Sequence, residues 1–357
     1  MTRITKRKFK SLCFYVASWL VGSFLFVTLY FYGKPTFTDP ALYVITFQFA
    51  LLAGLSHGIY DVVILQDDKD HRPVWAALLI RSLHLFSNVI INMSLCVFVW
   101  SLNDTGKMIT EDSLKFLFYI FTQPEIQVFA IYSFLMGFMI TFIRSVHKKF
   151  GTRVFVNTLL GKYQEPTEEE RVFMFVDLRH STRLAEELGH VTYSNFLKDY
   201  YHLLSNCCEE NRGEIYQIAG DGVYITWPID RCKNKPRPML CFYDLNLCFE
   251  RTRKNFEKEY GVYPTFKAAA HCGKVIVTEV GNFGSEIAFH GDAMNTTARL
   301  QDLCSPLGKE FIISEDLLKR LPNTETYHPQ AQGIYELKGK KNGISIYTLN
   351  FSLDNHK

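Results

Sequence analysis

The sequence predicts two unlike halves, an α-helical membrane half followed by an α+β half. Long apolar runs fill the chain up to about residue 147, and short apolar runs alternate with helical patterns from residue 171 onward. A polar, proline-containing segment at residues 164–170 separates the two patterns. In a chain of 357 residues, we therefore expect a transmembrane helical domain over 1–147, a linker over 148–170 and an α+β domain over 171–357.

Four apolar runs in the first half are long enough, or nearly so, to cross a hydrocarbon core of about 30 Å. They cover residues 12–32, 41–65, 75–100 and 127–143. No small-residue cleavage site follows the first run, which argues against a signal peptide. We expect about four spanning helices in contact with membrane lipid.

Basic residues flank this half on both sides. They are Arg3, Lys6, Arg7, Lys8 and Lys10 before the first run, and Arg144, Lys148, Lys149 and Arg153 after the last. The positive-inside rule then places both flanks in the cytoplasm, which requires an even number of spans. We expect a multi-pass protein of the cell membrane whose N-terminus and second half are cytoplasmic. The net charge of +3 reflects this topology and gives no indication of nucleic-acid binding.

The second half predicts strands and helices in alternation, with helices on one side of a sheet. The expected elements are a strand at 171–177, a helix at 183–208, a hairpin at 214–218 and 223–227, a helix at 240–260, strands at 265–270 and 275–279, a helix at 293–304 and a hairpin at 333–337 and 344–349. The nine cysteines contain no Cys-x-x-Cys pair, so reduced thiols are expected.

Two aspartates lie where short strands meet tight turns. Asp177 ends the first strand, and Asp221 lies in a Gly-Asp-Gly turn. Such carboxylates can share a pair of divalent ions, which suits chemistry on a nucleotide phosphate. Taken singly, Asp177 has the alternative interpretation of a helix N-cap and Asp221 that of an ordinary hairpin turn.

Three further blocks follow in a fixed order. They are the strand 266–271 running into Gly273, Gly291 followed by Asn295 and Arg299, and Lys338-Gly339-Lys340. With Asp177 and Asp221 ahead of them, these blocks resemble the catalytic domain of class III nucleotidyl cyclases, the adenylate and guanylate cyclases, in a membrane-anchored bacterial form. The resemblance covers about half of the chain and implies a ferredoxin-like α+β core.

The resemblance implies that ATP is converted to 3′,5′-cyclic AMP and pyrophosphate with two Mg²⁺ or Mn²⁺ ions. Asp177, Asp221 and the backbone carbonyl of Leu178 are the expected metal ligands. The helix that begins near Ser181 and Thr182 offers free backbone N–H groups to phosphate oxygens.

Asn295 and Arg299 are spaced by four and share one helix face. In the family these positions orient the ribose and stabilise the transferring phosphoryl group, and Lys338 and Lys267 match triphosphate and phosphate contacts. Because the loop after Lys338 is one residue longer than usual, Lys340 is an alternative. The metal aspartates and the Asn/Arg pair come from different domains in the family, which implies a homodimer.

Base recognition departs from the best-known pattern. The two base-contacting positions hold Gln217 and Ala288, where adenylate cyclases usually carry Lys and Asp or Thr, and guanylate cyclases carry Glu at the first. A glutamine amide can serve either purine edge. ATP is the expected substrate; the alternatives are a guanylate cyclase using GTP and a cyclase-like nucleotide sensor without turnover.

Four ionisable residues lie within the second and third apolar runs. Asp61 and Arg81 are expected at similar depth, and so are His57 and His84. One interpretation is an Asp61–Arg81 ion pair with histidines that hydrogen-bond between helices. The other is a regulatory site for a ligand, a metal or haem between the two histidines.

Overall fold

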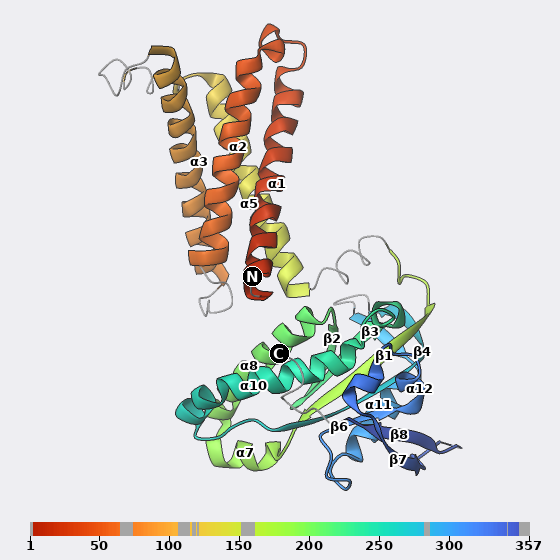
Figure 1. Cartoon of the computed structure of the whole chain (residues 1–357). Coiled ribbons are helices and arrows are strands. Elements are labelled where there is room, and N and C mark those ends of the chain that lie inside the picture. The colour runs from red at the N-terminus through yellow and green to blue at the C-terminus, as the bar shows by residue number, and fades with distance from the viewer. Residues whose placement is uncertain are drawn as a thin grey trace. The chain divides into compact units, whose positions relative to one another are not determined.

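The computed structural model describes residues 3–64, 74–105, 115, 119, 121–150, 161–281, 286–340 and 342–349. The chain divides into two compact units, Met1–Thr152 and Arg153–Lys357 (Figure 1). Residues 151–160 of the predicted linker lie outside the described residues.

The first unit is built from helices. They are α1 (Arg3–Phe31), η1 (Pro35–Thr38), α2 (Pro40–Ile59), the π-helical turn η2 (Tyr60–Ile64), α3 (Val74–Thr105) and α5 (Pro124–Phe150). Asp39 caps α2 by accepting a hydrogen bond from the backbone N–H of Ala41. Helices α1 and α2 pack closely at Gly54, where any side chain would collide with the backbone of Val16. Trp19 fills the interior of the unit and is fully buried.

Three helices of this unit are long and apolar enough to span a membrane, namely Lys8–Phe31, Pro40–Val63 and Pro124–Arg144. In α3, which covers the predicted span 75–100, the described apolar part is the shorter stretch Leu79–Leu95. A crossing helix needs about 20 apolar residues. The expectation of four spans is thus corrected to three candidates. Because three is an odd number, the count of spans no longer agrees with the expectation that both flanks of this unit are cytoplasmic.

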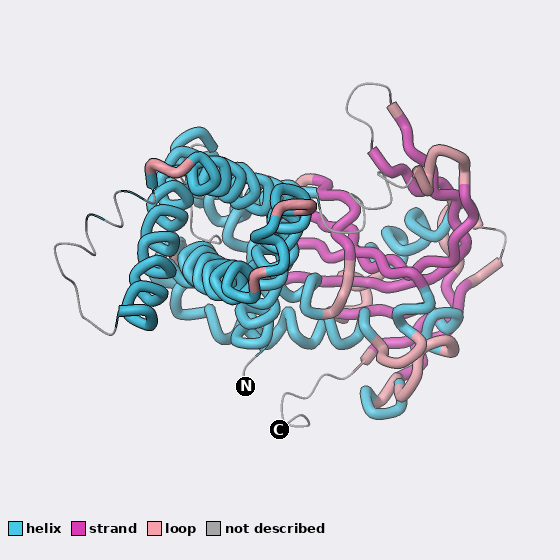
Figure 2. The backbone as a smooth tube through the Cα atoms, turned by 90° about the horizontal axis from the view of Figure 1, so that it is seen from above, coloured by secondary structure: helices cyan, strands magenta, loops and turns pink. Residues whose placement is uncertain are grey.

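The second unit contains a mixed sheet of eight strands within the described residues (Figure 2). The strands are β1 (Thr167–Leu178), β2 (Glu214–Ala219), β3 (Gly222–Pro228), β4 (Phe266–Val280), β5 (Glu286–His290), β6 (Phe311–Ser314), β7 (Gln330–Tyr335) and β8 (Ile344–Thr348). Their order is β2-β3-β1-β4-β6-β8-β7, and β5 pairs with β4. The β4–β6 pair is parallel and the other pairs are antiparallel.

Helices cover both faces of this sheet, whereas the sequence predicted helices on one side only. The helices are α7 (Ser181–Leu188), α8 (His190–Glu210), α9 (Ile229–Cys232), α10 (Arg237–Tyr260), α11 (Asp292–Asp302) and α12 (Glu315–Leu318). Because side chains alternate along a strand, Met174 packs with residues of α8 and α10 in one core, while Phe173 packs with Ala293 of α11 in another. Helix α11 therefore packs on the face of the sheet opposite to α8 and α10.

Three predictions of strand or helix extent differ from the structure. The strands expected at 265–270 and 275–279 are one strand, β4, because it pairs with β1 through Gly273 without interruption. The helix expected at 183–208 is two helices, since Gly189 between α7 and α8 has a φ of +73°, which a helix interior does not allow. Strand β1 begins at Thr167, earlier than the predicted Arg171.

Candidate active site

Asp177 lies near the end of the central strand β1, opposite Gly222 of β3 on one side and Lys267 of β4 on the other. Its Oδ2 accepts a hydrogen bond of 2.8 Å from Nε2 of Gln301, on α11. The Lys267 ammonium lies 3.5 Å from the same oxygen and 3.3 Å from the Ser305 hydroxyl. Two groups thus hold one carboxylate oxygen of Asp177.

The β2–β3 turn presents Asp221 beside this strand end. Gly220 has a φ of +63°, a conformation that glycine adopts without strain. The Tyr201 hydroxyl, on α8, donates a hydrogen bond to the Gly220 carbonyl. A side chain at Gly222 would collide with the ring of Phe175. Both glycines of the turn are therefore required by its geometry.

The two carboxylates interact electrostatically. Burial raises the pKa of Asp177, and the negative charge of Asp221 raises it further. The Gln301 hydrogen bond and the Lys267 ammonium act in the opposite direction. Two carboxylates with one ammonium leave negative charge uncompensated at this edge of the sheet. Hard oxygen donors in a negative field suit Mg²⁺, which proteins hold through one or two carboxylates together with substrate phosphates. The residues therefore fit divalent cations, although the described residues contain no cluster of three or more His, Cys, Asp or Glu with metal-ligand geometry.

The other residues expected to contact the metal ions or the phosphates are Leu178, Ser181 and Thr182, which follow Asp177 in the chain. The Leu178 side chain is buried in the core, so that only its backbone is available as a ligand. Helix α7 begins at Ser181 with His180 as its N-cap residue, and no side chain caps it. The first N–H groups of α7, next to Ser181 and Thr182, are therefore left for an external acceptor.

Helix α11 has one face that is buried against the sheet and another that is at least partly exposed. Ala293, Thr296, Thr297, Leu300 and Gln301 are buried against the sheet. Asn295 is exposed and Arg299 is half-buried. Arg299 and Gln301 are two residues apart, about 200° around a helix. Gln301 thus points to the Asp177 of its own chain, while Arg299 points away from it.

The loop before β8 approaches helix α11 at Arg299 and at Asp292. A methyl group built on Gly339 would lie 3.6 Å from both terminal nitrogens of Arg299. The Lys340 ammonium lies 2.7 Å from Oδ2 of Asp292 and lowers the pKa of that carboxyl. Lys338, in contrast, is exposed. The structure therefore brings Lys340, the alternative to Lys338, to the N-terminus of α11.

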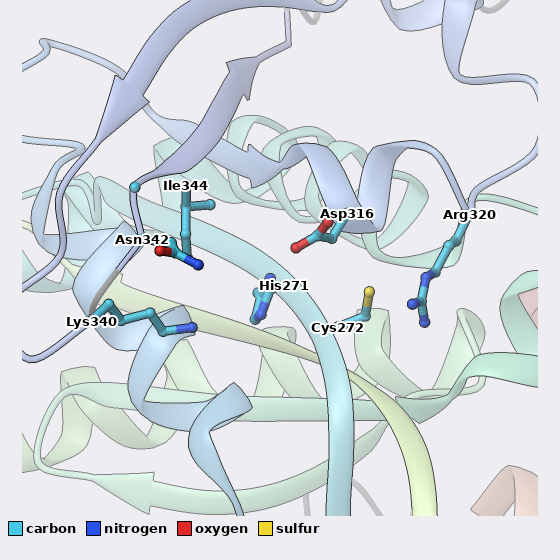
Figure 3. A pocket seen from close by; sticks show the side chains of 8 residues that line it. His271, Cys272, Asp316, Arg320, Lys340, Asn342 and Ile344 are labelled. Atoms are coloured by element: carbon cyan, nitrogen blue, oxygen red, sulfur yellow. The ribbon is translucent and has the colours of Figure 1, made fainter.

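Lys340 also lines a cavity of about 380 Å³ together with His271, Asp316 and Asn342 (Figure 3). Nδ1 of His271 lies 2.7 Å from the Ser314 hydroxyl. Burial, followed by the charge of Lys340, lowers the pKa of His271 to about 4, so this imidazole is neutral at pH 7.

The two positions expected to contact the base lie on β2 and β5. Gln217 is exposed on β2 after a bulge, and Ala288 is half-buried on β5. Their neighbours join the strands: the Tyr216 ring meets the Phe289 ring edge-on at 4.6 Å between centroids. Ala288 has no polar group in its side chain, so of these two positions only Gln217 offers side-chain hydrogen bonds.

The ionisable residues of the first unit, Asp61, Arg81 and Arg144, form a packed cluster. Asp61 accepts a hydrogen bond from the Tyr15 hydroxyl, and its oxygens lie 3.6 Å from Nε of Arg81 and 3.1 Å from Nε of Arg144. The Asp61–Arg81 pair agrees with the first interpretation of these residues; Arg144, on α5, is an addition.

The two histidines of this cluster have partners of their own. Nε1 of Trp19 donates to Nδ1 of His57 over 3.1 Å, so Nε2 carries the proton and lies 3.1 Å from the Thr141 hydroxyl. His84 stacks on Tyr60 with ring centroids 3.5 Å apart, and its buried Nε2 has no hydrogen-bond partner among the described residues, contrary to the hydrogen bond between helices expected for it. Both ring nitrogens of His57 are occupied, which suits interhelical hydrogen bonding rather than ligation of a metal or haem.

Sequence reasoning missed Gln301 and Tyr201. Gln301 lies two positions after Arg299, and its partner Asp177 is 124 residues away. A polar residue on the apolar face of α11 was the available signal. Tyr201 follows Tyr200 on α8 and could be read only as part of an apolar stripe.

Comparison with known proteins agrees with this arrangement. The model of the adenylate and guanylate cyclase catalytic domain matches residues 163–351. Adenylate cyclase 2 of Rhizobium meliloti is 33% identical over 226 residues, which are 63% of this chain and 62% of that protein. An adenylate cyclase of Anabaena cylindrica is 23% identical over 185 residues, 49% of this chain and 35% of that protein. The chain thus spans less than two thirds of the length of these relatives.

A solved structure shares the fold. The structure of a bacterial light-regulated adenylyl cyclase superposes with a TM-score of 0.50 at 18% identity, covering 64% of this chain and 66% of the other. The family model matches more than half of the present sequence. The chain belongs to the adenylate and guanylate cyclase catalytic domain family.

Proposed function

We propose that this protein is a membrane-anchored adenylate cyclase, which converts ATP to 3′,5′-cyclic AMP and pyrophosphate in active sites shared between two copies of the chain. The observation that carries the proposal is the opposed orientation of side chains on α11. Gln301 holds the metal aspartate of its own chain, while Asn295 and Arg299 face away from it. Residues that must act on one substrate are thus available only across an interface.

The metal half of each site consists of Asp177, Asp221 and the backbone carbonyl of Leu178. Bound Mg²⁺ or Mn²⁺ would lower the pKa of the ribose 3′-hydroxyl and screen the charge of the triphosphate. Gln301 and Lys267 fix one oxygen of Asp177 and leave the other free to bind. The free N–H groups of α7, beside Ser181 and Thr182, receive phosphate oxygens.

The partner half consists of Asn295, Arg299 and Lys340. The Asn295 amide orients the ribose. The planar guanidinium of Arg299 donates to the phosphoryl oxygens as charge develops on them. Lys340 would exchange Asp292 for the triphosphate, since the ammonium is already half-buried at this end of α11.

The choice of ATP rests on the relatives. Two bacterial relatives of the chain are named adenylate cyclases, whereas the family includes guanylate cyclases. Gln217 presents both a donor and an acceptor, so a guanylate cyclase is the second candidate.

The membrane half anchors the catalytic half in the cytoplasm. Three candidate spans precede the catalytic unit. Basic residues follow the last one, at Arg144, Lys148 and Lys149. By the positive-inside rule, this end of α5 is cytoplasmic.

The reaction is tested with the purified full-length protein, ATP or GTP, and Mg²⁺ or Mn²⁺, with mass-spectrometric identification of the products. Cyclic AMP and pyrophosphate are expected. Cyclic GMP formed at a higher kcat/KM would replace the first candidate by the second. Nucleotide binding by folded protein without a cyclic product would overturn both and indicate a nucleotide sensor.

A further inference from the structure

Two cysteine thiols meet between helices α8 and α10. Cys207 donates a hydrogen bond to the sulfur of Cys248, with the two sulfurs 3.2 Å apart. Cys207 is buried, and Cys248 is half-buried. The pair is separate from the aspartates and from α11, and the proposed function makes no use of it.

The two helices are fixed in antiparallel register on both sides of this pair. One turn beyond Cys207, the Asn211 amide donates to the Asp244 carboxylate over 2.9 Å. Toward the other end, the Tyr260 hydroxyl donates to the Asp199 carboxylate over 2.7 Å. The sulfurs therefore face each other because the helix backbones are held in place. A disulfide has an S–S distance of about 2.05 Å, so the two sulfurs, now 3.2 Å apart, would have to approach each other by little more than about 1 Å.

The two thiols are unequal in reactivity. The hydrogen bond from Cys207 lowers the pKa of the Cys248 thiol. Cys248 is also the more accessible of the two. Thiolate character together with access is what makes a cysteine react with peroxides. Burial and the same hydrogen bond raise the pKa of Cys207, which suits a second, resolving thiol.

We propose that Cys207 and Cys248 form a peroxide-sensitive dithiol–disulfide pair that links α8 to α10. The Cys248 thiolate attacks hydrogen peroxide, so that an S–O bond forms and the O–O bond breaks with release of hydroxide. The Cys207 sulfur then attacks the Cys248 sulfur; the S–S bond forms, the S–O bond breaks, and the oxygen leaves as water with the Cys207 proton. Two thiols are oxidised, and one peroxide is reduced to water.

The disulfide would stabilise the catalytic unit. It would close a loop between residues 41 positions apart and thereby restrict the unfolded chain. It would also clamp α8, whose Tyr201 holds the Gly220 carbonyl beside Asp221.

The test treats the full-length protein with hydrogen peroxide, alkylates the remaining thiols and digests it for mass spectrometry. A Cys207–Cys248 cross-linked peptide is expected, reversible by dithiothreitol. The temperature at which the catalytic unit becomes susceptible to protease should rise by about 5 °C. Neither readout requires cyclase activity, so the result is independent of the proposed function.

Two variants make the result specific. Cys248→Ser should abolish the cross-link and the thermal shift, while Cys232→Ser, at a buried cysteine of α9, should keep both. Cys207→Ser should instead accumulate a dimedone-reactive sulfenic acid at Cys248. Recovery of both residues as free thiols after peroxide treatment, or an equal cross-link in Cys248→Ser, would overturn the proposal.

Discussion

Asp61 in the first unit and Asp177 in the second unit are aspartates in opposite surroundings. The Asp61 side chain is 5% exposed and is surrounded by the Tyr15 hydroxyl and two guanidinium groups of its own chain. The Asp177 side chain is 22% exposed and has one amide, one ammonium at 3.5 Å and a second carboxylate nearby. The single negative charge of Asp61 thus faces two positive charges, whereas the two negative charges of Asp177 and Asp221 share one. A carboxylate satisfied from within serves packing, whereas one left short of positive charge is available to bind an external cation.

The largest effect on activity is expected when a carboxylate is removed from the edge of the sheet that carries Asp177 and Asp221. Asp177→Ala or Asp221→Ala should lower kcat by more than about a hundred-fold even at saturating Mn²⁺, because metal ions supply several kcal/mol of charge stabilisation. Folding should be kept, since each side chain lies at the end of a strand or in a turn. Steady-state rates and thermal unfolding of both variants measure this. Substantial residual activity in either would remove the two-ion assignment.

Removal of Asp61 should act on stability instead. Asp61→Ala would leave the half-buried guanidinium groups of Arg81 and Arg144 without this carboxylate, which costs about 3 kcal/mol, the lower end for a buried pair. The matched control is Asp39→Ala, which removes only the cap of α2 and should cost about 1 kcal/mol. The yield and thermal stability of the purified membrane protein give the comparison. A normal amount of folded Asp61→Ala protein with altered cyclase activity would favour the regulatory interpretation of the His57–His84 region.

A smaller effect should follow from Gln301→Leu. The Gln301 hydrogen bond lowers the raised pKa of Asp177, so its loss should raise that pKa further. Activity requires the ionised carboxylate and falls as pH drops through its pKa. The acid limb of the pH–rate profile should therefore move to higher pH, and the Mn²⁺ concentration for half-maximal rate should rise by roughly 10-fold.

The control for this variant is Gln332→Leu, on β7, which should change neither quantity. A purely structural role of Gln301 would lower stability while leaving the acid limb in place.

The smallest expected change concerns the base. Gln217→Glu should shift the ratio of kcat/KM for ATP and GTP toward GTP by about 10-fold, since a carboxylate accepts from the guanine N1–H and 2-amino group. The same carboxylate would face the unprotonated N1 of adenine. An unchanged ratio would mean that the base is recognised elsewhere than at Gln217.

Local patterns predicted where Asp177 and Asp221 lie in the fold, at the end of a strand and in a turn between two glycines. Asn295 and Arg299 come from the resemblance to the cyclases, and their spacing of four places them on one face of a helix. These signals lie within a few residues and follow from backbone geometry. The hairpins around Asp221 and before the C-terminus were predicted for the same reason.

The features that the sequence did not predict depend on distant partners. Gln301 acquires its role only when α11 covers the end of β1. The pairing of Cys207 with Cys248 depends on the register of α8 and α10, and adjacent Cys207 and Cys208 gave no indication of it. Strand β4 continues through Gly273 because β1 pairs along its length. Such contacts are set by packing of elements, which local periodicity does not encode.

The central claim is that the metal aspartates and Arg299 serve one substrate from different chains. Mixing Asp177→Ala with Arg299→Ala chains tests it most directly, because a mixed dimer contains one site with every residue intact. Half of randomly paired dimers are mixed, and each has one of two sites, so about a quarter of wild-type activity should return. The control mixture of Asp177→Ala with Asp221→Ala should stay inactive, since both changes fall in the same half of the site. Activity no higher than that of either variant alone, with subunit exchange demonstrated, would contradict the shared site.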